Sequence, residues 1–218
     1  MKPKELSEST GKSVADLGID YTGGNFDCSF NRLTSLEGAP SRVGGSFNCS
    51  YNELTSLEGA PSHVSGNFDC SLNHLTSLEG VPRHIDVGIY CSHNQLTSLE
   101  GAPSHVGGDF DCSYNELTSL EGAPSRVDGS FSCSVNNLTS LKDVHKHITE
   151  IRGKFYAVNN PIESHVLGLL LIKGVTEVRL DNKQVKEILN RHLGKGRVGM
   201  LMAQEELIEA GLEEFAQL

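Results

Sequence analysis

The chain has 218 residues, of which 37% are hydrophobic, and it carries 18 Lys and Arg against 28 Asp and Glu. This content is enough for one substantial core, or for a repeat array with a small cap. The formal net charge of −10 argues against a phosphate-binding surface, so we expect no nucleic acid partner. No charged start followed by an apolar run and no apolar run of 18 residues is present, so we expect a soluble, cytoplasmic protein without membrane contact.

Residues 1–22 precede the first repeat and have only a weak apolar pattern. We expect a short helix or loop here that covers the first coil, because an open array needs a cap at each end. The sequence then divides into this N-terminal cap, a repeat array over residues 23–162 and a C-terminal cap over residues 163–218.

A 21-residue unit, FxCSxNxLTSLEGAPxxVxG, recurs six times in register. Such a period takes precedence over any local assignment of secondary structure. A seventh unit fits if three residues are inserted, with Phe155, Ala157, Asn160 and Ile162 at the Phe, Cys, Asn and Leu positions. The six units are marked by one cysteine and one asparagine each: Cys28, Cys49, Cys70, Cys91, Cys112 and Cys133, and Asn31, Asn52, Asn73, Asn94, Asn115 and Asn136.

In each unit Phe and Cys alternate with polar residues, which is the pattern of a strand with one buried face. The unit therefore predicts one short strand, and Gly-Ala-Pro breaks regular structure after it. Stacked units form a parallel sheet with about 4.8 Å between strands, each layer covering the one before. The sequence thus predicts a repeat solenoid of about six or seven coils.

The asparagine column is expected to point inward, its amide bonding backbone groups that the turn leaves unpaired. The cysteine column has no CxxC, CxxH or HExxH spacing, so we expect no metal and no cofactor. Equivalent side chains of neighbouring coils lie parallel and face the same way, which does not suit a disulfide framework. We expect small buried thiols in a reducing compartment.

The run FNCSYNELTSL, from Phe47 to Leu57, resembles the LxLxxNxLxxL signature of leucine-rich repeats, with Phe47 and Cys49 at the first two Leu positions and Asn52 at the Asn position. The following EGAPSHV resembles the short proline-containing return of the bacterial type, found in secreted effectors of pathogens, and similar arrays occur in bacterial and bacteriophage proteins. The resemblance covers residues 23–160 and implies a leucine-rich-repeat-like coil in a bacterial or phage-infected cytoplasm. The ligase activity of some such effectors depends on a cysteine outside the repeats, whereas every cysteine here is inside them, so that activity is not implied.

After the repeats, residues 163–172 predict a short apolar helix ended at Gly174, and residues 175–180 predict a strand. With a further strand over residues 155–158, the helix between them is a crossover that adds a strand to the same parallel sheet. Asp181, with Gln184 three residues later, predicts the N-cap of a helix. One face of that helix is apolar: Val185, Ile188, Leu189 and Leu193.

The run GKGRVG lacks the spacing of a phosphate-binding loop and follows a helix rather than a strand, so we expect a hinge between two helices. Residues 200–218 predict a last amphipathic helix. Its apolar side is expected to contain Leu201, Ile208, Leu212, Phe215 and Leu218.

The outward residues of the strands are expected to cover the concave face, and these positions vary between units. An acidic strip beside an aromatic and apolar strip suits a protein partner with a basic surface. The alternative is that the rings cover neighbouring Ser side chains and backbone and so stabilise the sheet. The position after Phe holds Asp27, Asn48, Asp69, Tyr90, Asp111 and Ser132, and the position before Asn holds Phe30, Tyr51, Leu72, His93, Tyr114 and Val135.

Two further columns are expected at exposed turn positions on the return side, which is the part of each coil that follows the strand and contains Gly-Ala-Pro. One is a column of Glu, and one carboxylate per coil supplies too few oxygens for a calcium site. Histidines can sense pH, but a polar turn position serves solubility equally well. The columns are Glu37, Glu58, Glu79, Glu100 and Glu121, and Arg42, His63, His84, His105 and Arg126.

Every Ser or Cys near a His recurs in several units, which indicates architecture rather than a catalytic site. We therefore expect a non-enzymatic protein-binding module, of the effector or inhibitor kind if the resemblance holds. The alternative is a scaffold protein that forms homo-oligomers through its C-terminal helices. An enzyme remains a third class, with any exceptional residue near His165 or His192 in the tail.

Overall fold

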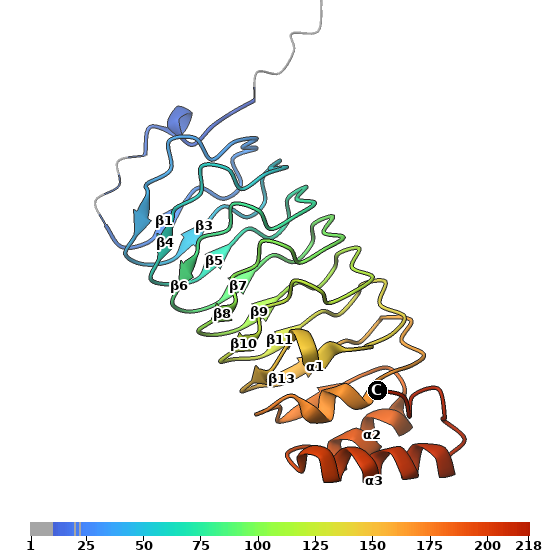
Figure 1. Ribbon diagram of the computed structural model, residues 1–218. Coiled ribbons are helices and arrows are strands. Elements are labelled where there is room, and N and C mark those ends of the chain that lie inside the picture. The colour runs from blue at the N-terminus through green and yellow to red at the C-terminus, as the bar shows by residue number, and fades with distance from the viewer. Residues whose placement is uncertain (1–10, 20, 22) are drawn as a thin grey trace, which may run out of the picture.

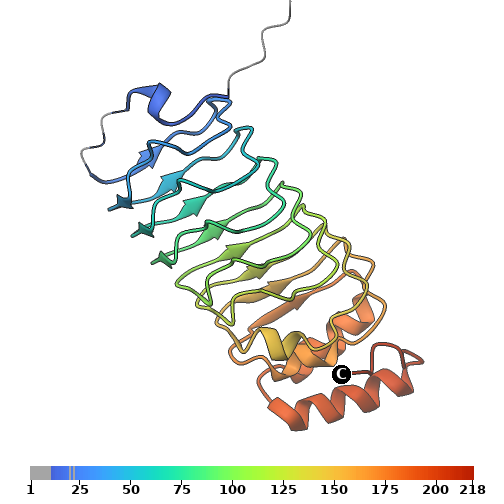
Figure 2. The same ribbon diagram turned by 45° about the horizontal axis from the view of Figure 1, so that its top comes forward.

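A computed structural model describes residues 11–19, 21 and 23–218. The chain winds into about seven parallel β coils at a 21-residue spacing, followed by helices that close the C-terminal end of the stack (Figure 1). Figure 2 shows the same elongated stack in a turned view, with the strands of successive coils side by side. This arrangement confirms the predicted repeat solenoid with a helical C-terminal cap.

One strand of each coil joins a continuous eight-stranded parallel sheet. Equivalent residues pair, so Phe47 lies opposite Phe26 on one side and Phe68 on the other. The strands are β1 (Phe26–Asp27), β3 (Phe47–Asn48), β5 (Phe68–Asp69), β7 (Ile89–Tyr90), β9 (Phe110–Asp111), β11 (Phe131–Ser132), β13 (Lys154–Tyr156) and β14 (Glu177–Arg179).

The prediction of one strand per coil is wrong, because a second strand of two residues lies on the return side. Its inward residue is the Val or Ile of the repeat, and its partner is the equivalent strand of the next coil. This strand has a single inward apolar residue, whereas Phe and Cys together mark the first strand, so no alternating pattern indicated it. These strands form two separate three-stranded parallel sheets: β2 (Arg42–Val43), β4 (His63–Val64) and β6 (His84–Ile85), and β8 (His105–Val106), β10 (Arg126–Val127) and β12 (Glu150–Ile151).

The core consists of columns of identical side chains stacked from coil to coil. The rings of Phe47 and Phe68 are parallel within 7°, with centroids 5.5 Å apart. All six cysteines are free and buried, as expected. Burial raises the pKa of the Cys28 thiol to about 12, and it raises the pKa of the other five thiols as well.

The inward asparagine column is also confirmed. Asn115 Oδ1 accepts from Leu96 N at 3.0 Å, and its Nδ2 donates to the carbonyls of Cys91 and Cys112 at 3.1 Å each. From Asn52 onward, each asparagine amide of the column thus joins its own coil to the preceding one. The buried backbone groups at this corner have partners that the coil geometry alone does not supply.

The seventh coil has the predicted residues at the predicted positions. Phe155 pairs with Phe131, and Asn160 Nδ2 donates to the Cys133 and Ala157 carbonyls at 3.0 and 3.2 Å. The short helix α1 (Val144–His147) lies in the segment where the sequence has three additional residues.

The C-terminal cap continues the sheet before it closes it. Strand β14 pairs with β13, as predicted, and the expected apolar helix between them is the 3₁₀ helix η2 (Leu167–Leu171). Helix α2 (Lys183–His192) buries Val185, Ile188 and Leu189. The predicted bounds of the hinge and of the last helix are wrong, because α3 (Gly196–Glu209) begins inside the GKGRVG run and ends nine residues before the predicted end at residue 218.

Two further details of the cap differ from the prediction. The N-cap of α2 is Asn182, whose Oδ1 accepts a hydrogen bond from Val185 N at 3.0 Å. Asp181 does not cap the helix, because its carboxylate accepts a hydrogen bond from the backbone N–H of Asn159 at 2.7 Å. Of the expected apolar side, Leu201 and Ile208 of α3 point outward and are 53% and 50% exposed, whereas Leu212 and Phe215 lie after α3 and pack against the core. The buried face is instead Gly199, Met200, Ala203 and Leu207.

The small residues explain this rotation of α3. A Cβ at position 199 would lie 2.5 Å from the His192 carbonyl oxygen, so the helix approaches the end of α2 with its glycine side. The apolar period of the outer residues gave no indication of this close approach.

At the N-terminal end, residues 11–19 lie against the first coil. Thr34 N donates to the Lys12 carbonyl and Ala15 N to the Glu37 carbonyl, both at 2.9 Å, and the 3₁₀ helix η1 spans Ala15–Leu17. This confirms the expected short helix or loop for these residues, whereas the remainder of the predicted cap, residues 1–10, 20 and 22, lies outside the described residues. Among the described residues, no helix has the length and apolar character to cross a membrane.

Candidate functional site

The acidic column, which is the position after Phe in each repeat, lies on the outward face of the eight-stranded sheet, in register from strand to strand. Tyr90 of β7 pairs with Asp69 of β5 on one side and Asp111 of β9 on the other. Asn48 and Asp27 continue the column through β3 and β1. The predicted site residues of this position are thus brought together on one surface, which we call the sheet face.

Each aspartate of the sheet face has a structural role that uses only one of its oxygens. Asp69 Oδ1 accepts from Ser71 N at 2.9 Å, and Asp111 Oδ1 accepts from Ser113 N at 3.0 Å. The Oδ2 atom of either residue makes no hydrogen bond within the described chain. One oxygen of each carboxylate therefore fixes the side chain, and the other is available to a ligand.

Tyr90 interrupts the small polar residues of the sheet face with a large ring. Burial raises the pKa of its phenol, and the carboxylates of Asp109, Asp111 and Asp69 raise it further. The half-buried phenol therefore lies in a negative potential, flanked by carboxylates on adjacent strands. An aromatic ring beside carboxylates is an arrangement that binds ammonium and guanidinium groups.

The aromatic column, which is the position before Asn in each repeat, is not part of the strands, contrary to the prediction. Its residues have left-handed backbone conformations, with φ of 57° at Phe30, 53° at Tyr51, 55° at His93 and Tyr114 and 56° at Leu72. This conformation turns the chain after each strand and brings the next residue, the asparagine, inward. The repeat has no glycine at this position, so no residue type marks the turn.

The rings of this column stack in pairs. Phe30 and Tyr51 have centroids 4.1 Å apart, and His93 and Tyr114 have centroids 4.0 Å apart, with interplanar angles of 15° and 13°. Phe30 is nevertheless 70%, Tyr51 49% and Tyr114 50% exposed. The rings thus stack on one another and still present an apolar surface to solvent.

The basic column of the return side occupies the second strands rather than turns, which corrects its predicted location. His105 Nε2 lies 3.0 Å from Asp128 Oδ2, and Arg126 Nε donates to Asp128 Oδ1 at 2.9 Å. Arg126 and His105 hold the pKa of the Asp128 carboxyl at about 2. Within the described residues, no cluster of three or more His, Cys, Asp or Glu side chains is suited to a metal ion.

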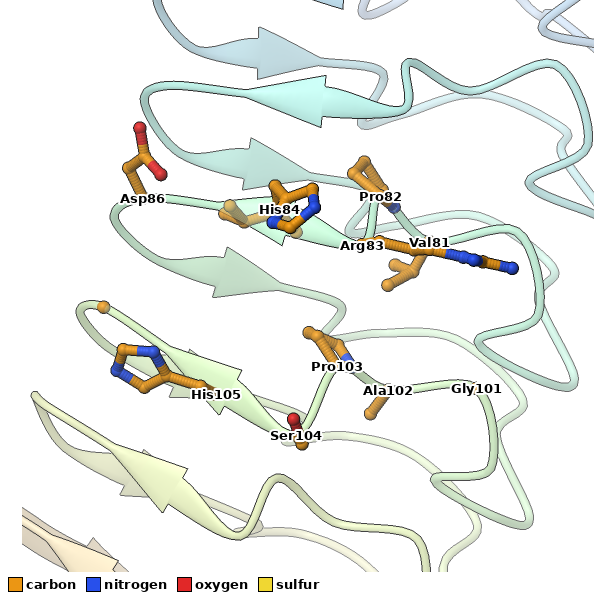
Figure 3. Close-up of a pocket in the computed structure, with 12 residues that line it drawn as sticks. Val81, Pro82, Arg83, His84, Asp86, Gly101, Ala102, Pro103, Ser104 and His105 are labelled. Carbon is orange, nitrogen blue, oxygen red and sulfur yellow. The ribbon is translucent and has the colours of Figure 1, made fainter.

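A cleft of about 560 Å³ on the return side was missed by sequence reasoning. It lies between the coil that carries His84 and the coil that carries His105 (Figure 3). A signal was present, because residues 81–87 depart from the repeat at several positions at once.

Comparisons with protein-family models, with curated proteins and with solved structures give no significant match. A proposal on function therefore depends on the surfaces described above.

Proposed function

We propose that the protein is a non-enzymatic protein-binding module, of the leucine-rich-repeat type that its motif resembles. Its partner presents a basic surface to the sheet face. The observation that supports this most is the position of Tyr90 between Asp69 and Asp111, in register on three neighbouring strands.

The chemistry of the sheet face favours a Lys or Arg side chain at its centre. A cation over the Tyr90 ring gains from the ring and from two carboxylates whose Oδ2 atoms have no partner in the described chain. The stacked pairs Phe30–Tyr51 and His93–Tyr114 add exposed apolar area of the kind that anchors interfaces. Recognition would then combine a central cation site with aromatic contacts.

The setting that fits this proposal is a reducing cytoplasm, bacterial or phage-infected, where the protein acts as an effector or inhibitor of the partner. Six free, buried thiols are compatible with that compartment. No catalytic step is assigned, because the Ser and Cys residues of the repeats recur along the array as part of its architecture, and His192 of the tail is bonded to Glu206 Oε1 at 2.6 Å.

Affinity capture with matched variants tests the proposal. The site variant combines Asp69→Asn, Asp111→Asn and Tyr90→Ala, and the control variant, Glu58→Gln with Glu100→Gln, makes the same change of charge on an exposed column of the return side. We expect the control to retain every protein captured by the wild type and the site variant to lose at least one of them. If the site variant captures the same set, the sheet face is not the binding surface.

A scaffold role is the second candidate, supported by the outer face of α3. Val198 is 65%, Leu201 53%, Met202 45% and Ile208 50% exposed on this helix at the end of the array. Light scattering distinguishes the candidates: a scaffold self-associates, and Leu201→Glu with Ile208→Glu makes it monomeric. A wild type that is monomeric at high concentration excludes this candidate.

A further inference from the structure

The return side of the array is open at one junction. The two three-stranded sheets end at β6 and β8, and these two strands are not hydrogen-bonded to one another, although the sheet face continues through β7 and β9. The coils therefore remain paired on the sheet face, whereas on the return side they touch at Gly107 and Asp86 but are not paired at β6 and β8. The cleft of about 560 Å³ lies at this unpaired junction (Figure 3).

Substitutions in the third coil account for the opening. Val81 is buried where the neighbouring coils have Ala60 and Ala102, so its additional methyl groups lie between coils that are otherwise closely stacked. Val87 stands where other coils have glycine.

Glycine is required at this second position because the preceding coil lies against it. A Cβ at Gly66 would be 2.7 Å from the Gly45 carbonyl carbon, and a Cβ at Gly129 would be 2.6 Å from that of Gly108. The equivalent distance, from a Cβ at Gly108 to the Val87 carbonyl carbon, is 3.1 Å, so the spacing is larger at this position, although a Cβ at Gly107 would still be 2.2 Å from the Asp86 carbonyl oxygen.

The opening leaves unpaired backbone groups on both sides of the cleft. At the neighbouring junctions Asp86 N donates to the Val64 carbonyl at 3.1 Å, and Asp128 N donates to the Val106 carbonyl at 2.9 Å. The equivalent bond at this junction would run from Gly107 N to the Ile85 carbonyl. It is not formed in this fully described part of the chain. Unpaired backbone groups at a strand edge are available to hydrogen-bond the backbone of a peptide.

The charges at the cleft favour an acidic segment. Arg83 lines the cleft, and its guanidinium forms no ion pair with any described residue. His84 and His105 extend from β6 and β8, and the Asp86 carboxylate points away from the coil of His105 (Figure 3). A guanidinium without a partner binds a carboxylate well, because it can donate two parallel hydrogen bonds.

We propose that this cleft binds a short, carboxylate-bearing peptide segment of a partner protein, which hydrogen-bonds the unpaired backbone groups of β8 at the cleft and places its carboxylate on Arg83. A cleft volume between about 300 and 1000 Å³ is typical of ligand sites, so only a short segment fits. This site is separate from the sheet face and has the opposite charge preference.

Selection from random hexapeptides displayed on phage, with the full chain immobilised, provides the test. We expect enriched peptides to contain Asp or Glu well above their frequency in the starting library. Fluorescence anisotropy then measures the affinity of the synthetic form of the most enriched peptide. No enrichment, or enrichment of peptides without carboxylates, overturns the proposal.

Three variants connect that binding to the cleft. Arg83→Ser, which restores the residue of the second coil, and the closing variant Val81→Ala with Val87→Gly are each expected to weaken binding at least tenfold, whereas Arg42→Ser, on the same side of the first coil, changes it less than twofold. Equal binding by the closing variant or by Arg83→Ser contradicts the proposed site. Tyr90→Ala should bind the peptide as the wild type does, so failure of the sheet-face proposal leaves this test unaffected.

Discussion

The second and third coils have the same frame and different return segments. Asn52 and Asn73 make equivalent hydrogen bonds to their own and the preceding coil, and β3 and β5 pair in the same register. Strand β4 nevertheless has a partner on both sides, whereas β6 has only β4. The frame of each coil is therefore independent of its return segment, and the return side can open without disturbing the core.

The largest effect is expected from a change in the frame. Asn115→Leu removes hydrogen bonds to four backbone groups, of Leu96, Cys91, Cys112 and Ser113. Because buried backbone groups without partners cost about 1–3 kcal/mol each, we expect a loss of roughly 3 kcal/mol in the free energy of unfolding. Denaturant unfolding measures it.

Asn137→Leu is the matched control for this change, because Asn137 is exposed and is not part of the asparagine column. We expect its effect to stay within about 0.5 kcal/mol. Equal effects of the two substitutions would contradict the view that the column holds the frame together.

Closing the cleft should have the next largest effect, and it should be stabilising. The variant Val81→Ala with Val87→Gly restores the residues of the second coil, so β6 and β8 can approach and pair. Substitutions towards a consensus sequence commonly add about 0.5–2 kcal/mol, and we expect a gain near 1 kcal/mol in chemical denaturation. A loss of stability would mean that the two valines fill space that the closed coil cannot fill.

A substitution at the left-handed turn should also raise the free energy of unfolding, by as much as closing the cleft does or by less. Val135 has φ of 56°, a conformation that a β-branched side chain rarely adopts. The left-handed region costs an ordinary residue about 1–2 kcal/mol, and asparagine tolerates it better, so Val135→Asn should raise the free energy of unfolding by about 1 kcal/mol. The exposed Val87→Asn, at a different backbone conformation, should not give this gain.

The smallest effect concerns charge on the return side. The pKa of the Asp128 carboxyl is about 2, below its ordinary 3.8, because Arg126 and His105 hold the charged form. A lowered pKa contributes stability above about pH 4 and loses it as the pH falls towards 2. Asp128→Asn should therefore be less stable than the wild type at pH 7, with the difference vanishing near pH 2 in thermal unfolding scans.

The equivalent residue of the third coil provides the control. Asp86 forms no ion pair with any described residue, so Asp86→Asn should leave the pH dependence unchanged. If both variants shift the pH dependence alike, the ion pairs around Asp128 contribute nothing specific to the joined return strands.

The frame was predictable because its side chains recur with the period of the backbone. Cys112 and Asn115 occupy positions that only a buried column explains, and the same rule placed Phe155 and Asn160 in a seventh coil despite the shifted spacing. Strand β14 followed from the same reasoning, because a short apolar segment between two strand patterns indicates a crossover.

The missed features depend on contacts rather than on periodicity. The second strands have one inward apolar residue each, which makes no alternating pattern, and the left-handed turn at Tyr51 lacks the glycine that usually marks one. The buried side of α3 is set by the approach of Gly199 to the end of α2. The cleft depends on what Val81 and Val87 meet in the neighbouring coils, and only a structure supplies that information.

Amide hydrogen exchange in the native protein tests the interrupted return side most directly. Gly107 and Asp128 occupy equivalent positions in successive coils, and only the Asp128 N–H has a carbonyl partner in the preceding coil. Unpaired amides exchange with little protection, so we expect the protection factor of Gly107 to be at least about tenfold lower than that of Asp128. Equal protection of the two amides would show that β6 and β8 are joined, and the cleft and its proposed ligand would both be wrong.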